Sequence, residues 1–325
     1  MPEIGGTEPR DLLVVDLLGG LGDLVMALPV VHGLAARFPR AALRVLTHDP
    51  GATLLDTDPT VTEVLRAGKG REREAVEAAL DRADLVVSTT RLHGIPELVE
   101  ERGVPGVTNL WRSPPPDEPV SRRYVRILAE EGLVSSAYRA PRIHLTEAER
   151  RAAEEDLPDG VPIVLVPTAG MEVKLWPHWA SLVGLLAAEL PDHPVVAVGK
   201  GAPVRELPPT DLRGLAARFA AVGRRCGVVV GPDTGPVRIA AAMGAGTVGL
   251  FGPTLAARYG FDGPAVNLQG LPGCPHRRPT AITEQVCWWE ARCPLAEGSA
   301  CMADISPARV AMAVRAVLTP SPGLA

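Results

Sequence analysis

Short apolar runs alternate with longer amphipathic stretches over the first part of the chain. The apolar runs have the length and β-branched content of buried strands, and the stretches between them repeat apolar residues at helical spacing. Strands that alternate with helices in this way predict βαβ units and a parallel sheet. The predicted strands are Leu12–Leu18, Leu43–Thr47, Val61–Arg66, Leu85–Ser88 and Val104–Thr108, and the predicted helices are Leu24–Phe38, Ala52–Asp56 and Glu72–Arg82.

A proline-rich segment, SPPPDEP at residues 113–119, interrupts this pattern, and a second set of the same kind follows it. A helix over Ser121–Glu131 and a loose stretch up to His144 lie between the two sets. The chain is therefore predicted to form two doubly wound, Rossmann-like α/β domains that face each other across a cleft, which is the default ligand site. The second set has strands at Val161–Val166, Val195–Val198, Val228–Val230 and Thr247–Phe251 and helices at Trp179–Glu189 and Leu212–Gly223.

The domain boundaries follow from these breaks. We predict a flexible N-terminus at residues 1–10, an N-terminal domain at 11–145 and a C-terminal domain at 146–305, with a cysteine-rich segment at 264–303. Residues 306–325 are predicted to be a final helix, capped by Ser306, and a short tail. A length of 325 residues agrees with two domains of about 150 residues each.

Composition excludes some classes of protein. The chain is 46% apolar but only 4% aromatic, which predicts a core built mainly from Ala, Val and Leu. No apolar run approaches the roughly 20 residues that span a bilayer. The N-terminus lacks the basic and apolar regions of a signal peptide, so we expect a cytoplasmic location. A formal charge of −5 gives no reason to expect nucleic acid as a partner.

The segment Gly231–Thr254, GPDTGPVRIAAAMGAGTVGLFGPT, carries the strongest chemical signal. It follows an apolar strand, with Thr234 as the expected N-cap and Pro236 in the first helical turn. Free backbone N–H groups from Gly235 onward and the positive end of the helix dipole make an anion site, to which Arg238 would add a full charge. The pattern predicts a phosphorylated ligand, and a diphosphate suits it best.

A glycine-rich turn with an acidic residue follows the first strand of the chain. Gly19, Gly20 and Gly22 allow a tight turn, and Asp23 stands where the helix begins. Asp23 could simply cap the helix. Its position at the carboxyl end of a strand also suits a general base for a hydroxyl group, because the helix start keeps a carboxylate ionised.

The loop after the first strand of the second set combines small residues with a lysine. Thr168, Ala169 and Gly170 would let a ligand approach backbone N–H groups closely, and Lys174 would add a positive charge for a phosphate oxygen. A solvated lysine is the alternative for Lys174. The chain has only three lysines, at positions 69, 174 and 200.

Three motifs in this order resemble the heptosyltransferases, family nine of the bacterial glycosyltransferases. They are GGLGDLVMALPVVHGLAARFP, KLWPHWASL and GPDTGPVRIAAAMGAGTVGLFGPT, and the resemblance covers most of residues 12–318. It implies the GT-B fold and an enzyme that transfers a sugar such as heptose from a nucleotide-diphosphate donor, often ADP-heptose, to a hydroxyl group. It also implies inversion without a metal, with the acceptor bound by the N-terminal domain and the donor by the C-terminal domain.

The resemblance implies roles for individual residues. Asp23 matches the family's base, and Lys174 matches a lysine that contacts the donor phosphates. Asp233 to Gly235 match the segment whose Asp binds the donor sugar and whose helix start supports the leaving diphosphate. Many relatives have His where this chain has Arg238, which favours a phosphate contact here. Glu206 is the nearest match to the acidic residue that binds the nucleoside ribose.

Four of the five cysteines lie close together in the sequence. Such a density in a cytosolic protein favours a structural zinc or iron site over disulfides, although the spacing lacks a CxxC pair. Some members of the resembled family hold a structural iron with four C-terminal cysteines. Separate thiols are the alternative, and no cofactor is expected for catalysis. The four residues are Cys274, Cys287, Cys293 and Cys301.

Two other functions stay open at this point. GT-B-like sheets also carry nucleotide-sugar epimerases and hydrolases, which would need a further acid or base and no acceptor pocket. A non-catalytic sugar-nucleotide binder would have no use for Asp23. The sequence does not identify the acceptor, which is expected to be a small molecule, a glycan or a natural product.

Overall fold

The computed structural model describes residues 8–319 except 111 and 113, so most of the predicted flexible start and of the predicted tail lies outside the description. Within these residues the chain divides into two compact units. The first unit contains the chain up to Pro114 together with Val120–His144. The second contains Pro115–Pro119 and the chain from Leu145 onward.

The described residues of the first unit form a five-stranded sheet in which every pairing is parallel. The strand order reverses between β1 and β4, and such a switch point is where doubly wound sheets bind ligands. From one edge to the other the strands are β3 (Glu63–Ala67), β2 (Ala42–His48), β1 (Asp11–Asp16), β4 (Leu85–Ser88) and β5 (Gly106–Val107).

The second unit repeats this plan with a six-stranded parallel sheet over its described residues. Its order reverses between β6 and β9, which gives the second unit a switch point of its own. From edge to edge the strands are β11 (Ala265–Gln269), β10 (Gly246–Phe251), β9 (Val228–Pro232), β6 (Ile163–Leu165), β7 (Val195–Ala197) and β8 (Arg205–Glu206).

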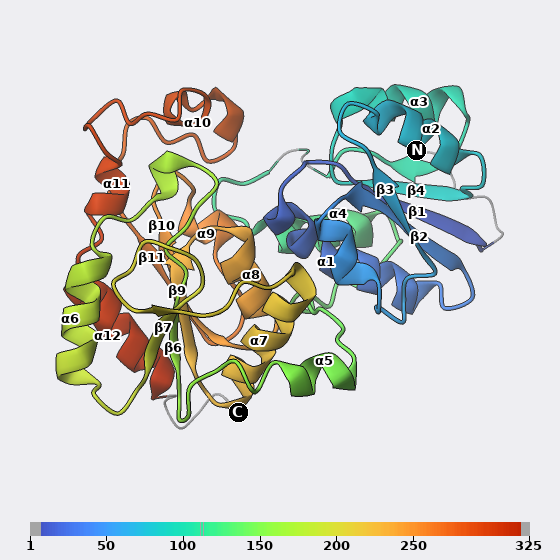
Figure 1. The fold of residues 1–325 in the computed structure, drawn as a ribbon. Coiled ribbons are helices and arrows are strands. Elements are labelled where there is room, and N and C mark those ends of the chain that lie inside the picture. Colours follow the sequence, from blue (N-terminus) through green and yellow to red (C-terminus); the bar gives the residue numbers. More distant parts are fainter. Residues whose placement is uncertain (1–7, 111, 113, 320–325) are drawn as a thin grey trace. The chain divides into compact units, whose positions relative to one another are not determined.

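Helices cover both faces of each sheet (Figure 1). In the first unit α1 packs against α4, and α2 packs against α3 on the other face. The helices of this unit are α1 (Leu21–Arg37), α2 (Glu72–Leu80), α3 (Ile95–Glu101) and α4 (Val120–Glu130), with the 3-10 turns η1 (Gly51–Leu55) and η2 (Leu92–Gly94).

In the second unit α6 and α12 lie on one face of the sheet, and α7 and α8 lie on the other (Figure 1). Trp176 and Trp179 are buried against this sheet, and the Trp176 indole N–H donates to the Ile305 carbonyl (2.9 Å). The helices are α5 (Glu147–Ala152), α6 (Trp179–Glu189), α7 (Leu212–Arg224), α8 (Gly235–Ala242), α9 (Ala256–Tyr259), α10 (Val286–Trp289), α11 (Ala300–Ala303) and α12 (Pro307–Leu318), with η3 (Glu172–Lys174) and η4 (Ile282–Glu284).

The two predicted parallel α/β sheets are confirmed, and nearly all predicted elements lie within a few residues of their expected bounds. Ser306 caps α12 by accepting a hydrogen bond from the Arg309 N–H, as its position indicated. The pattern missed α3, the short helices α9, α10 and α11, and the edge strands β8 and β11. β8 has only two residues, both polar, and β11 is only half-buried, so neither has the continuous apolar run of a buried strand. Within the described part of the chain, every helix is too short or too polar to cross a membrane.

One glycine controls how closely α8 approaches the sheet. A Cβ atom at Gly231, on β9, would lie 2.6 Å from Val237 Cγ2 and 3.0 Å from Val166 Cβ, so this strand position has no room for a side chain. We expect Gly231→Ala to lower the free energy of unfolding by about 1–3 kcal/mol through overpacking.

Gly184→Ala is the matched control, because a Cβ atom at Gly184, on α6, would meet no atom within 4 Å. Alanine is also the better helix former, by roughly 0.5–1 kcal/mol. Chemical denaturation measures both changes. Equal stability of the Gly231→Ala variant and the wild type would contradict the proposed close packing.

Candidate functional site

The switch point of the second unit brings together the segments that follow β6 and β9. The two strands are parallel neighbours, and beyond β6 the Val166 N–H still donates to the Val230 carbonyl (2.8 Å). The loop that continues from there contains residues 168–170, with Thr168 and Gly170 exposed. Asp233 directly follows β9, so the predicted small-residue loop and the predicted acidic residue leave the same edge of the sheet.

Asp233 is a buried carboxylate held between two cations. Arg238 Nη2 donates to Asp233 Oδ1 (2.5 Å), and Lys174 Nζ lies 3.2 Å from Asp233 Oδ2. Lys174 Nζ also donates to the Asp233 backbone carbonyl (2.8 Å). Two segments that are distant in sequence, the loop with Lys174 and the start of α8, therefore meet at one side chain.

The two cations keep Asp233 ionised. Burial alone would raise the pKa of this carboxyl group, but the charges of Arg238 and Lys174 outweigh burial and lower the pKa to about 2. The cluster of one carboxylate and two cations carries a net charge of about +1, since Lys and Arg stay protonated at neutral pH. It can therefore attract an anion.

The start of α8 adds backbone donors to this charge. Thr234 occupies the N-cap position with extended backbone, as predicted, but its side chain makes no capping hydrogen bond to the helix. Its hydroxyl instead donates to the Pro232 carbonyl (3.3 Å). Gly235 and Pro236 form the first turn, and a helix start whose N–H groups are not capped by a side chain is suited to bind a phosphate oxygen.

Arg238 is more deeply buried than its sequence position indicated. Its side chain is only 8% exposed, and its guanidinium also donates to the Tyr259 carbonyl (2.6 Å) and lies over the Phe261 ring. Much of its charge therefore compensates Asp233. Lys174 is the more accessible cation, at 14% exposure, and its ammonium group lies 5.2 Å from the centroid of the Trp288 ring.

Glu206 lies apart from this cluster in the sheet. It is an exposed residue on the edge strand β8, where it pairs with Ala197 of β7. In the sheet order β7 separates β8 from β6, so Glu206 lies two strands away from the switch point.

The switch point of the first unit carries the predicted base. Asp23 lies in the first turn of α1, while Gly20 occupies the N-cap position. A Cβ atom at Gly20 would lie 2.2 Å from Asp23 Oδ2, so the carboxylate folds back over this glycine. Gly19 has a positive φ of 88°, which lets the chain turn between β1 and α1.

The same switch point contains a second carboxyl group that the sequence analysis missed. Asp16 ends β1 and is only 2% exposed, and the Thr89 hydroxyl, which follows β4, donates to its Oδ1 (2.6 Å). Burial and the nearby charge of Asp23 raise its pKa to about 7. The available signal was one acidic residue inside the apolar run LLVVDLL.

The four clustered cysteines line one cavity in the second unit. This cavity is also bordered by Val173, Arg277 and Gln285. Arg277 donates to the Gly252 carbonyl (2.7 Å), and Gln285 donates to the Pro253 carbonyl (3.1 Å), which ties the cysteine-rich segment to the end of β10.

The thiols surround this cavity without converging on a point. Among the described residues, a group of three potential metal-ligand atoms within 4.8 Å of one another is formed by His32, Asp58 and His144, not by the cysteines. Burial raises the pKa of the Cys287 and Cys301 thiols. The cysteines form no disulfide.

Comparisons with known proteins assign part of the chain to a family. Residues 194–276 match the family model of glycosyltransferase family 9 (heptosyltransferase). This segment of the chain therefore resembles a glycosyltransferase family 9 domain. This segment includes Asp233 and Arg238, and the match indicates that the protein is a glycosyltransferase, which confirms the resemblance found in the sequence. No curated protein matches the chain.

Solved structures with the same fold extend the likeness to the whole chain. A glycosyltransferase family 9 protein from Veillonella parvula is 16% identical, with a TM-score of 0.74 over 95% of this chain and 97% of its own. The ADP-heptose lipopolysaccharide heptosyltransferase II of E. coli is 21% identical, with a TM-score of 0.69 over 95% and 98%. The chain therefore has a GT-B fold, as predicted.

A third structure of this fold contains a metal. The iron-containing dodecameric glycosyltransferase TibC from enterotoxigenic E. coli is 13% identical to this chain, with a TM-score of 0.59 over 96% of this chain and 77% of its own.

The raised pKa of Asp16 makes stability depend on pH. Between the ordinary aspartate value of 3.8 and about 7, the folded protein holds a proton that the unfolded chain has lost, so the free energy of unfolding falls as pH rises. Asp16→Asn keeps an acceptor for Thr89 and removes this dependence. We expect the variant to gain stability relative to wild type as pH rises, by about 1.4 kcal/mol for each pKa unit of the shift.

Urea denaturation at about pH 5 and about pH 8 measures this difference, since the two values lie within and above the transition. Asp192→Asn, at an exposed position, is the control and should behave alike at both pH values. A gain for Asp16→Asn that is the same at both pH values would contradict the raised pKa.

Proposed function

We propose that this protein is an inverting, metal-independent glycosyltransferase that moves heptose or a related sugar from a nucleotide-diphosphate donor to a hydroxyl acceptor. The observation that carries the proposal is the Asp233 cluster beside the start of α8, within the segment that matches glycosyltransferase family 9. An ADP-heptose-like donor is supported by the likeness to the ADP-heptose lipopolysaccharide heptosyltransferase II of E. coli, which shares the fold.

The donor diphosphate would bind at the start of α8. Gly235 and the following turn would supply N–H donors, the loop of residues 168–170 would allow close approach, and Lys174 would contact a phosphate oxygen.

Asp233 would accept hydrogen bonds from the donor sugar, because a carboxylate with a pKa of about 2 stays ionised. Arg238 would orient Asp233 more than it would contact the ligand, since its guanidinium is buried against that carboxylate. Glu206 stays a prediction for the ribose contact.

Transfer would occur in one displacement step. Asp23 would take the proton from the acceptor hydroxyl while the acceptor oxygen bonds to the anomeric carbon, and the bond from that carbon to the diphosphate would break. The nucleoside diphosphate leaves with the electron pair. Lys174 and the N–H groups of α8 would stabilise its charge, which supports transfer without a metal. One displacement at the anomeric carbon gives inversion.

The acceptor would be a small molecule, a glycan or a natural product with a free hydroxyl group. The Gly19–Gly22 turn supports an acceptor site near Asp23, because its backbone is exposed at Gly19 and Gly20. The cytoplasmic location and the absence of a nucleic-acid partner stay predictions.

Asp23 is tested by removing the base and by displacing it. Asp23→Asn should lower the rate of transfer by at least about a hundredfold, which is the usual contribution of a general base. Its affinity for the donor should stay unchanged. Transfer is measured as nucleoside diphosphate released in the presence of acceptor, and donor affinity by calorimetry.

Gly20→Ala provides a sharper version of this test. The backbone of Gly20 (φ −97°, ψ 134°) suits alanine, but the added Cβ atom would push the Asp23 carboxylate aside. We expect slower transfer with unchanged thermal stability. Wild-type turnover in either variant would show that Asp23 is not the base.

We also propose that the four cysteines hold a structural zinc or iron. The donor set supports this, because four thiols around one cavity provide the soft ligands that both metals accept. Binding would require Cys287 and Cys301 to lose their protons, so metal uptake would release protons. A bound metal would fix the segment that places Trp288 over Lys174.

Reduced, purified protein is expected to contain about one zinc or iron per chain at this site. Elemental analysis should find this metal lost from a variant with all four cysteines changed to serine. Cys293→Ser, at a half-buried position, should weaken metal retention with less effect on folding. Metal-free protein that is reduced and fully active would contradict the proposal.

A further inference from the structure

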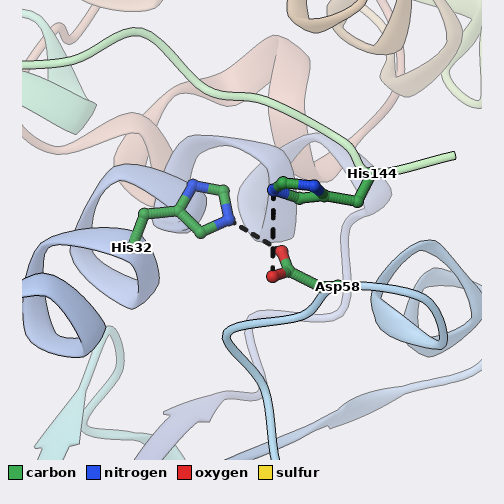
Figure 2. Close-up of side chains that lie close together, drawn as sticks. All are labelled: His32, Asp58 and His144. Carbon is green, nitrogen blue, oxygen red and sulfur yellow. Dashed lines mark hydrogen bonds and ion pairs between the residues drawn. The ribbon is translucent and has the colours of Figure 1, made fainter. Parts of the chain in front are cut away.

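Three metal-ligating side chains from separate segments meet in the first unit (Figure 2). His32 lies on α1, Asp58 lies in the turn between η1 and β3, and His144 lies in the segment that leads into α5. His32 and the proposed base Asp23 are nine residues apart on one helix, roughly 13 Å along its axis. The cluster is therefore separate from the proposed catalytic site.

The distances within this cluster suit a metal ion. His32 Nε2 lies 2.7 Å from Asp58 Oδ2, and His144 Nε2 lies 3.9 Å from Asp58 Oδ1. One ligand atom from each residue lies within 4.8 Å of the other two. The imidazole rings stand nearly perpendicular, at 85°, with their centroids 5.6 Å apart.

Neighbouring hydrogen bonds hold Asp58 and His144 in place. The Thr60 N–H and hydroxyl both donate to Asp58 Oδ1, at 2.9 and 2.7 Å, and leave Oδ2 directed at His32. The Thr57 hydroxyl donates to the His144 carbonyl (2.9 Å). Outer hydrogen bonds of this kind orient the ligands of metal sites.

The charge of the cluster also favours a cation. The Asp58 side chain is only 2% exposed, and the basic side chains that contact it are the two imidazoles. A buried carboxylate needs a positive partner, and a metal ion between the three side chains would supply one. His144 is 40% exposed, so an ion could enter from solvent and keep water ligands on that side.

We propose that His32, Asp58 and His144 bind a divalent transition-metal ion, zinc in the first place. Two imidazole nitrogens and one carboxylate oxygen form a donor set that suits zinc and its neighbours better than magnesium or calcium, and three protein ligands leave a position for water. The ion would join α1, the turn after η1 and the last residue of the first unit, His144. Its role is structural, and it does not depend on the proposed transfer reaction.

This proposal is tested by zinc binding to the reduced full-length protein, from which metal is first removed with a chelator. In calorimetric titrations with zinc, His32→Gln and His144→Gln should each weaken one class of sites at least about tenfold, the usual effect of losing a metal ligand or its support. His144→Gln is expected to fold normally because His144 is half-exposed. The wild type should gain thermal stability on adding zinc, and His144→Gln should gain less.

His93→Gln is the matched control. His93 and His48 flank the Glu72 carboxylate at 4.0 and 3.9 Å, a second set of two histidines and a carboxylate with longer spacing. This variant should bind zinc as the wild type does.

Cobalt distinguishes this site from the cysteine cavity. Thiolate ligands give cobalt an intense charge-transfer absorption, whereas the His and Asp ligands give only weak d–d bands. The d–d bands of the His–Asp site should disappear in His32→Gln and His144→Gln while any thiolate absorption persists. Zinc binding in these two variants that equals the wild type, or cobalt spectra with thiolate absorption alone, would overturn the proposal.

Discussion

The proposed donor site depends on the buried carboxylate of Asp233 and the two cations that compensate it. Arg238 comes from α8 and Lys174 from η3, so their bonds to Asp233 fix the start of one helix against the loop that follows β6. Removing one partner of such a pair leaves a buried charge, which typically costs about 3–5 kcal/mol. The same contacts leave a net positive charge beside an uncapped helix start, which is the physical basis for the proposed diphosphate site.

The fold could be predicted because its signals are local. Buried parallel strands have continuous apolar runs, and the turns between strands and helices carry glycines or capping residues, as at Gly19 and Ser306. The elements that the pattern missed lack these signals. β8 is two polar residues at a sheet edge, and it becomes a strand only because β7 offers it a partner.

The candidate sites could be predicted only in part. Asp23, Lys174 and Asp233 could be proposed as site residues from the sequence because each follows a strand in a recognisable loop. The roles of other residues come from contacts between distant segments, which a local pattern does not contain. Burial in the sheet raises the pKa of Asp16 to about 7, and the partner of this carboxyl group, Thr89, lies 73 residues away in the sequence. Arg238 was expected to meet the ligand, but burial places most of its charge on Asp233.

The cysteine-rich segment and the proposed donor site are physically connected. Val173 borders the cysteine cavity, and the adjacent Lys174 contacts Asp233 and lies beneath the Trp288 ring. A change in the packing of this cavity would therefore reach Lys174 directly. This connection gives the proposed structural metal a functional consequence although it takes no part in the reaction.

Calorimetric titration with ADP tests the central claim, a nucleoside diphosphate bound beside Asp233, most directly. We expect ADP to bind the wild type and Lys174→Met to weaken this binding at least about tenfold, which corresponds to about 1.4 kcal/mol. Lys69→Met, at an exposed lysine of the other unit, should bind ADP like the wild type. A wild type that does not bind ADP, or a folded Lys174→Met variant that binds ADP as tightly as the wild type, would contradict a diphosphate site beside Asp233.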